Sequence, residues 1–137
     1  MRKNPCRVFG SDLKVGIAEH HSFVYPDAMV ICGKITYAED RNDVVTNPLL
    51  IVEVLSDSTE SYDRGRKFKK YQTLASFTEY VLVSQHEPLV EVFFRQDERQ
   101  WLYTVAEGLD ATIALRSINS ELSLREIYNK VDFQAAP

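Results

Sequence analysis

Apolar residues in this chain gather in short runs that are separated by turn-forming residues, a pattern typical of β-strands. The intervening stretches 20–26 and 34–48 are polar, and we interpret them as a turn and a surface connection. The apolar runs predict strands at about residues 6–9, 13–18, 27–33, 49–55, 78–84, 89–95, 101–106 and 112–115.

Two segments indicate helices. Ser56 to Thr59 has the residues of a turn and a helix N-cap, so we expect a helix from about Glu60 to about Leu74. A second helix is expected from about Leu122 to Lys130. Strands, a helix, more strands and a terminal helix together predict an α/β fold in which helices pack on a mixed sheet.

One carboxylate, Glu53, interrupts the apolar run from Leu49 to Leu55. Such a run is typical of a buried central strand, where an ionised carboxylate costs several kcal/mol unless a cation or hydrogen bonds compensate it. We therefore expect Glu53 either to bind a metal ion or to form a buried ion pair.

The helix that follows this strand offers a cation to Glu53. Asp63, Lys67 and Tyr71 are spaced by four residues and stack along the apolar stripe of the helix. Lys67 is thus aimed at the strand that carries Glu53. Asp27 opens a neighbouring strand, and two strand-end carboxylates beside a lysine are typical of a site for a hard cation such as Mg²⁺.

These segments together resemble the Uma-two family of the PD-(D/E)XK nuclease superfamily. The resemblance runs from about Pro5 to about Tyr128 and implies a restriction endonuclease-like fold, with a mixed central sheet flanked by helices. It also implies Mg²⁺- or Mn²⁺-dependent hydrolysis of phosphodiester bonds in DNA. The residues that carry it are Tyr25-Pro26-Asp27, Ile51 to Thr59, Asp63, Lys67, Tyr71 and Glu79 to Val83.

The resemblance assigns the metal ligands residue by residue. Asp27 matches the first acidic ligand, Glu53 matches the second, and the backbone carbonyl of Val54 completes the metal site. Leu55 stands where the superfamily has its lysine, and Lys67 from the following helix takes that catalytic role.

The other residues of this helix receive supporting roles. Asp63 is expected to pair with Lys67, and Tyr71 to orient it. Arg64 and Lys70 belong to a cluster of five cations within seven residues, which we interpret as a phosphate-binding surface. This local charge offsets a net charge of −4, which by itself argues mildly against a large nucleic-acid footprint.

Composition places the chain among single-domain globular proteins. It has 137 residues, 45% of them hydrophobic and 26% charged, and we treat residues 1–137 as one restriction endonuclease-like domain. No apolar stretch is long enough to span a membrane and no secretory signal begins the chain, so we expect a cytoplasmic location. Cys6 and Cys32 are then expected to be reduced core thiols.

Two alternatives to a nuclease stay open at this point. The first is a catalytically inactive nuclease-fold module that binds nucleic acid or protein. The second is a structural homo-oligomer in which Glu53 and Lys67 form a buried ion pair. Because the family begins with additional N-terminal helices that this chain lacks, one sheet face would be left uncovered, and we expect a homodimer to cover it.

Overall fold

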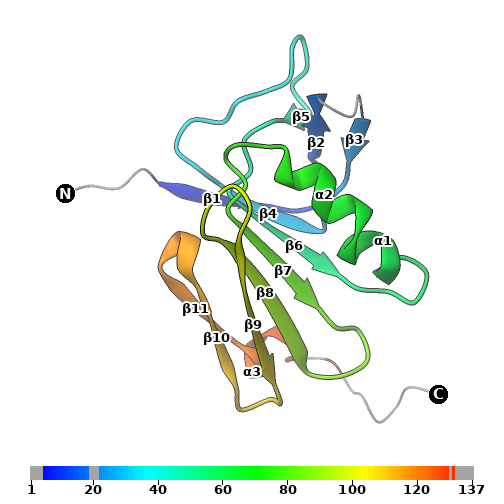
Figure 1. Cartoon of the computed structure of the whole chain (residues 1–137), viewed down its shortest axis with the longest axis vertical. Coiled ribbons are helices and arrows are strands. Elements are labelled where there is room, and N and C mark those ends of the chain that lie inside the picture. Colours follow the sequence, from blue (N-terminus) through cyan, green and yellow to red (C-terminus); the bar gives the residue numbers. More distant parts are fainter. Residues whose placement is uncertain (1–4, 19–21, 130, 132–137) are drawn as a thin grey trace.

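A six-stranded mixed sheet forms the centre of the protein (Figure 1). The structure is a computed structural model that describes residues 5–18, 22–129 and 131. Strands β6 and β7 are parallel, and every other neighbouring pair in this sheet is antiparallel. Its strands, in spatial order, are β1 (Cys6–Phe9), β4 (Ala28–Cys32), β6 (Leu50–Val54), β7 (Glu79–Val83), β8 (Leu89–Arg95) and β9 (Trp101–Glu107).

Two smaller sheets and short helices complete the fold. The three-stranded sheet has the order β3 (Ser22–Val24), β2 (Lys14–Ile17), β5 (Val44–Val45), and the hairpin consists of β10 (Thr112–Leu115) and β11 (Ser120–Ser123). The α-helices are α1 (Glu60–Arg64), α2 (Arg66–Gln72) and α3 (Leu124–Ile127), and a 3-10 turn, η2, spans Arg116–Ile118.

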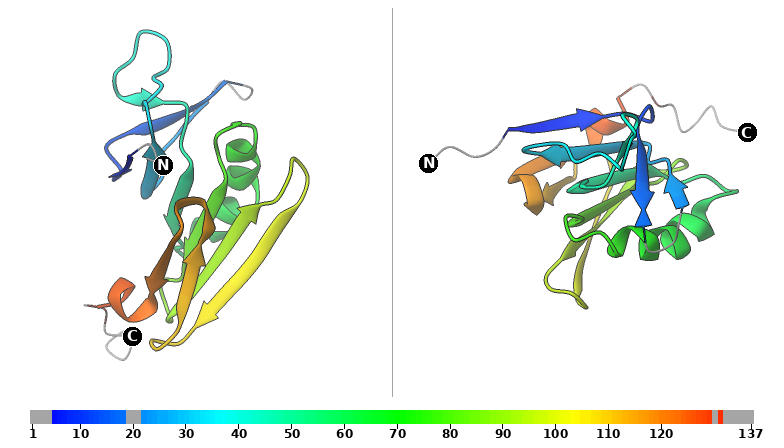
Figure 2. Two further views of the ribbon diagram at one scale, coloured as in Figure 1. Left: turned by 90° about the vertical axis from the view of Figure 1, so that its left-hand side faces the viewer. Right: turned by 90° about the horizontal axis from the view of Figure 1, so that it is seen from above.

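The two faces of the central sheet carry two separate hydrophobic cores. On one face, Ile51 and Leu82 pack with Tyr71 of α2. On the other face, Val81 and Val92 pack with residues of β10 and α3. Figure 2 shows the two groups of elements on opposite sides of the sheet. Because side chains alternate along β6, Glu53 faces α2 together with Ile51.

The predicted α/β fold, a mixed sheet flanked by helices, is confirmed, but several element boundaries differ. The helix expected from Glu60 to Leu74 divides at Gly65 into α1 and α2. The last helix is shorter than expected because Ser120–Ser123 pairs with β10 as β11.

Two strands lie inside segments that we interpreted as non-strand. Ser22–Val24 forms β3 within the predicted turn, of which residues 20 and 21 lie outside the described residues. Val44–Val45 forms β5 within the predicted surface connection, and both valines are fully buried. Both strands are held by pairing with β2, which is a tertiary contact rather than a local preference.

Cys6 and Cys32 form a disulfide, so the prediction of reduced core thiols was wrong. The antiparallel register of β1 and β4 places the two residues directly opposite each other, with Cα atoms 3.9 Å apart. Cys6 is exposed, and Cys32 is half-buried at the border of the second core. No helix among the described residues is long and apolar enough to cross a membrane.

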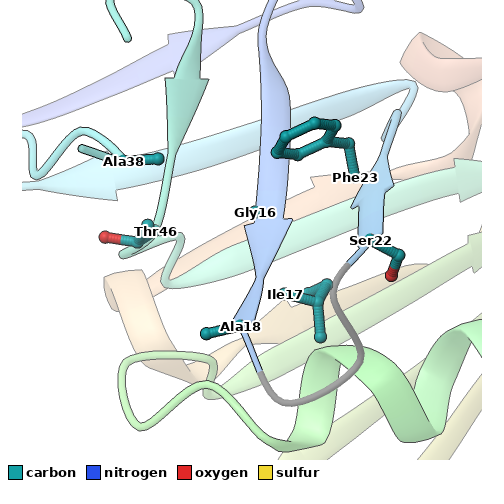
Figure 3. A pocket seen from close by; sticks show the side chains of 7 residues that line it. All are labelled: Gly16, Ile17, Ala18, Ser22, Phe23, Ala38 and Thr46. Carbon is teal, nitrogen blue, oxygen red and sulfur yellow. The ribbon is translucent and has the colours of Figure 1, made fainter. Parts of the chain in front are cut away.

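A pocket of about 450 Å³ lies beside the three-stranded sheet (Figure 3). Its wall is largely apolar, and none of its lining residues carries a charge. They are Gly16, Ile17, Ala18, Ser22, Phe23, Ala38 and Thr46. The pocket therefore offers space but no ionisable group for chemistry.

Candidate functional site

Glu53 lies near the end of β6 and is 1% exposed. One carboxylate oxygen, Oε1, accepts a hydrogen bond from the backbone N–H of Asp27 at 3.3 Å. The other, Oε2, accepts from the Tyr71 hydroxyl at 3.0 Å and lies 2.7 Å from the Lys67 ammonium. The compensation that the sequence demanded for a buried carboxylate is thus provided by one cation and two hydrogen-bond donors.

Asp27 directly precedes β4. It bonds to β6 just beyond Ala28 and Val52, the last residue pair between the two strands. Its carboxylate oxygen Oδ2 accepts a hydrogen bond from the backbone N–H of Val54 at 2.7 Å. Its own N–H donates to Glu53, so the two acidic residues are linked reciprocally through the backbone. This places the exposed Asp27 carboxylate and the buried Glu53 carboxylate at the same end of the sheet.

Lys67 reaches this end of the sheet from α2, with 10% of its side chain exposed. Besides Glu53, its ammonium donates to the backbone carbonyl of Tyr25 at 3.1 Å and lies 3.8 Å from a carboxylate oxygen of Asp63. Asp63 is held in turn by the Thr59 hydroxyl at 3.2 Å. These distances confirm the predictions that Lys67 faces Glu53 and pairs with Asp63.

Burial has the largest effect on the pKa values of Glu53 and Asp63. It raises the pKa of Glu53 to about 7, although Lys67 and the Tyr71 hydroxyl pull that pKa down. Burial also raises the pKa of Asp63, with Lys67 again opposing the shift. Tyr71 has a raised pKa because it is buried beside the Glu53 carboxylate, so it stays a hydroxyl donor at neutral pH.

These side chains open into a pocket of about 370 Å³. It lies where β6 ends and α1 begins. Its lining residues are Tyr25, Asp27, Glu53, Val54, Ser56, Thr59, Tyr62, Asp63 and Lys67. The pocket thus combines three carboxylates and one ammonium with an opening to solvent.

The two residues expected to bind phosphate do not line this pocket. The Arg64 guanidinium is bound on three sides, to Glu60 at 2.7 Å and to both carboxylate oxygens of Glu91 at 2.7 and 2.8 Å. The Lys70 ammonium lies 3.4 Å from the Tyr62 hydroxyl. The structure therefore gives Arg64 a fixed place between helix and sheet, whereas Lys70 stays beside a pocket residue.

Sequence reasoning missed several groups of this site. The Tyr25 carbonyl and the Val54 N–H are backbone atoms, which carry no side-chain signal. Thr59 was interpreted only as part of a helix cap, although its hydroxyl also reaches Asp63. Tyr62 gave no signal because the helix wheel places it away from the apolar stripe.

The donor set fits a hard divalent cation that keeps several waters. Mg²⁺ is commonly held by one or two carboxylates, with water and substrate oxygens filling the remaining positions. Asp27 and Glu53 offer two carboxylates, and no described residue donates a hydrogen bond to the second oxygen of Asp27, Oδ1. Among the described residues, no three His, Cys, Asp or Glu side chains form a complete metal cage.

The sequence matches a protein-family model over residues 1–126, almost its whole length. The chain belongs to the Uma2 family. This family is described as "Putative restriction endonuclease". The resemblance that the Asp27, Glu53 and Lys67 segments carry is thereby confirmed at the level of the family.

Two relatives of this Uma2 chain come from the cyanobacterium Synechocystis sp. PCC 6803. Uncharacterized protein sll1609 is 41% identical over 106 residues, which cover 77% of this chain and 60% of the relative. Uncharacterized protein slr1290 is 34% identical over 130 residues, which cover 93% of this chain and 66% of the relative. The chain thus spans about three-fifths to two-thirds of the length of these relatives.

A solved structure has the same fold as this Uma2 chain. It is the crystal structure of "a putative nuclease belonging to DUF820" from Anabaena variabilis. The TM-score is 0.69 and the identity 18%, over 90% of this chain and 68% of the other. At this identity the similarity establishes the fold alone.

Proposed function

We propose that this Uma2 protein is a metal-dependent nuclease that hydrolyses phosphodiester bonds in DNA. The observation that carries the proposal is the meeting of Asp27, Glu53 and Lys67 in one open pocket, at distances of hydrogen bonds and ion pairs. Membership of a family described as restriction endonucleases supports the same reaction class.

Asp27 and Glu53 would hold Mg²⁺ or Mn²⁺, with the carbonyl of Val54 as a third oxygen donor. A bound divalent ion supplies an activated water and stabilises negative charge on the phosphodiester. Tyr71 holds Glu53 in place through its hydroxyl. Glu53 must be ionised to bind the cation, and the cation itself favours that ionised form.

The Lys67 ammonium adds a positive charge to the site besides that of the metal ion. This ammonium bridges Glu53 and Asp63 and is fixed by the Tyr25 carbonyl, so it is oriented before substrate arrives. In this position it stabilises the extra negative charge that develops on the phosphoryl oxygens during attack by water. Asp63 acts as a positioning residue because its carboxylate lies 3.8 Å from the Lys67 ammonium.

A nicking assay on supercoiled plasmid DNA tests this proposal. With Mg²⁺ or Mn²⁺ present, the wild-type chain should convert plasmid to the nicked form, and Lys67→Met should lower that rate at least a hundredfold. Lys69→Met is the matched control, because Lys69 is exposed on the same helix and should keep most of the activity. Equal rates for the wild type and Lys67→Met, or no nicking with either metal, would contradict the proposal.

A second candidate is a nuclease-fold module that binds without cutting. The 2.7 Å contact between Lys67 and Glu53 favours it, because an ion pair this close satisfies the carboxylate without any metal. The module would bind DNA with an affinity that Mg²⁺ leaves unchanged and would show no nicking. If the protein is instead a metal-dependent nuclease, Mg²⁺ should change its affinity for DNA and nicking should be observed.

A further inference from the structure

Two exposed tyrosines stand at the candidate site, and no step proposed above uses their rings. Tyr25, between β3 and β4, is 57% exposed, and Tyr62 of α1 is 37% exposed. Both residues line the pocket that contains Asp27, Glu53 and Lys67. Large aromatic side chains left in water at the mouth of a charged pocket indicate a ligand with flat apolar surfaces.

Each of these tyrosines has a lysine beside it. The Lys14 ammonium lies 5.7 Å from the centre of the Tyr25 ring. The Lys70 ammonium lies 5.6 Å from the centre of the Tyr62 ring and 3.4 Å from its hydroxyl. At Tyr62 the ring and the Lys70 ammonium together offer base stacking and attraction for an adjoining phosphate. At Tyr25 the charge of Lys14 is balanced by the Asp43 carboxylate at 3.2 Å, so this ring offers base stacking alone.

A second pocket continues this surface beyond Tyr62. It has a volume of about 490 Å³ and is lined by Ser58, Ser61, Tyr62 and Arg66. Tyr62 is common to both pockets, so it forms the wall between them. Hydroxyl groups and a guanidinium are the side-chain donors that commonly contact phosphate oxygens, which suits the next phosphate along a strand.

We propose that the site takes unpaired nucleotides, as in a single strand, a flap or an overhang, with bases stacked on Tyr25 and Tyr62. This inference rests on the proposed nuclease function and specifies its substrate class. In a duplex the base faces are already stacked on their neighbours, so these rings could reach them only after a base is flipped out at a cost of a few kcal/mol. In a single strand the base faces are free, and tyrosine rings bind them without sequence preference.

Fluorescence anisotropy of labelled oligonucleotides tests this substrate class. The probes are a 12-nucleotide single-stranded DNA, the RNA of the same sequence and the corresponding DNA duplex. Binding is measured with Ca²⁺, and parallel samples with Mg²⁺ or Mn²⁺ are followed on gels for cleavage. The wild type should bind single strands at least tenfold more tightly than the duplex. The RNA probe distinguishes a site that reads only base stacking from one that also requires deoxyribose.

The tyrosine variants separate stacking from other contributions. Tyr25→Leu and Tyr62→Leu should each weaken single-strand binding about tenfold, as expected for the loss of one stacked base, while Tyr25→Phe and Tyr62→Phe should retain it. Tyr37→Leu is the matched control, since Tyr37 is 45% exposed and lines neither pocket. All three leucine variants should keep the melting temperature of the wild type.

The results divide the two proposals. Tyrosine-dependent single-strand binding without any cleavage would support this inference and contradict the nuclease function. Duplex cleavage that Tyr25→Leu and Tyr62→Leu leave unchanged would support the nuclease function and overturn this inference. Equal affinity for single strands and duplex, or no binding of single strands, would overturn it as well.

Discussion

At the scale of single residues, the Glu53 side chain lies where burial and hydrogen bonding act in opposite directions. Burial favours the neutral acid, whereas Lys67, Tyr71 and the Asp27 N–H favour the carboxylate. With a pKa of about 7, Glu53 sits at the midpoint of its titration near neutral pH. A small change in its surroundings, such as a bound cation, is then enough to fix its charge.

This raised pKa predicts how stability depends on pH. In the unfolded chain Glu53 titrates near 4.5, so between pH 4.5 and 7 the folded state binds more protons than the unfolded state. The contribution of Glu53 to the free energy of unfolding must therefore fall as pH rises through this window, by roughly 3 kcal/mol at most.

Urea unfolding in EDTA at several pH values, for the wild type and Glu53→Gln, measures this contribution. Relative to Glu53→Gln, the wild type should lose stability from pH 4.5 to pH 7, and the difference between the two proteins should then level off. A wild type that gains stability over Glu53→Gln across the window would show that Lys67 outweighs burial.

At the residue scale, the sequence predicted the side chains of the site but not its backbone partners. A lone acid in an apolar run and a lysine on the inner helix stripe were enough to bring Glu53 and Lys67 together. The donation from Val54 to Asp27 depends on the register of β4 against β6, which no local pattern specifies. Asp27 itself was found through the resemblance and its place at a strand start.

At the scale of elements, the short helices α1 and α2 are joined to the sheet by the ion pairs Arg64–Glu91 and Lys67–Glu53. Arg64 at the end of α1 makes a bidentate contact with Glu91 of β8, and this contact lowers the pKa of Glu91. Glu91 is the ladder partner of Leu82, which in turn pairs with Glu53. The Arg64–Glu91 ion pair thus lies on the same sheet face as Glu53, and it holds the same helix pair that positions Asp63 and Lys67.

Removing the Arg64–Glu91 ion pair should lower the free energy of unfolding more than removing the neighbouring cation Arg66. We expect Arg64→Met to cost about 2 kcal/mol, because it leaves the Glu91 carboxylate, 8% exposed, without its cation. Arg66→Met, on an exposed position, should cost less than about 0.5 kcal/mol.

A double-mutant cycle with Glu91→Gln measures the coupling of the pair, for which we expect about 1 to 2 kcal/mol. Strictly additive losses would mean that Arg64 contributes through its contact with Glu60 instead.

Strands with a clear apolar run were predicted well, and elements that depend on partners were not. β8 and β10 have the expected bounds, since each presents a clear apolar run. β5 and β11 are short, sit among polar residues, and form only because another strand lies beside them. The disulfide escaped prediction for the same reason, as only the β1–β4 register reveals that its cysteines face each other.

The disulfide should stabilise the edge of the sheet. Cys6 and Cys32 are 26 residues apart in sequence, and closing a loop of this length is worth about 3.5 kcal/mol in the chain-entropy account. Reduction with dithiothreitol should therefore lower the free energy of unfolding by about that amount.

The matched control for this measurement is the double variant Cys6→Ser, Cys32→Ser, whose stability should not respond to the reductant. A wild type that is equally stable with and without dithiothreitol would contradict a stabilising disulfide.

At the scale of the whole molecule, the sheet face opposite Glu53 is only partly covered. The β10–β11 hairpin and α3 pack on this face, but Val8 and Val54 of the sheet remain 75% and 47% exposed. Val131, which follows α3, is 49% exposed. Val54 and Val131 also line an apolar pocket of about 380 Å³ next to α3. Apolar surface of this kind is commonly covered by another protein surface.

Self-association as a homodimer therefore stays a prediction of this account. Light scattering over a dilution series should show a mass that falls toward the monomer at low concentration. Val8→Asp, at an exposed strand position, should shift that equilibrium to the monomer without changing the fold. A monomer at every concentration would contradict the predicted dimer.

The central proposal is that Asp27 and Glu53 together hold a divalent cation. Thermal unfolding with increasing Mn²⁺ measures this, because a ligand that binds only the native state raises the melting temperature. The wild type should show a saturable rise, which Asp27→Ala should abolish. Asp12→Ala, which removes an exposed carboxylate from the turn between β1 and β2, should keep the full rise. A rise of the same size in Asp27→Ala, or no rise in the wild type, would contradict the account.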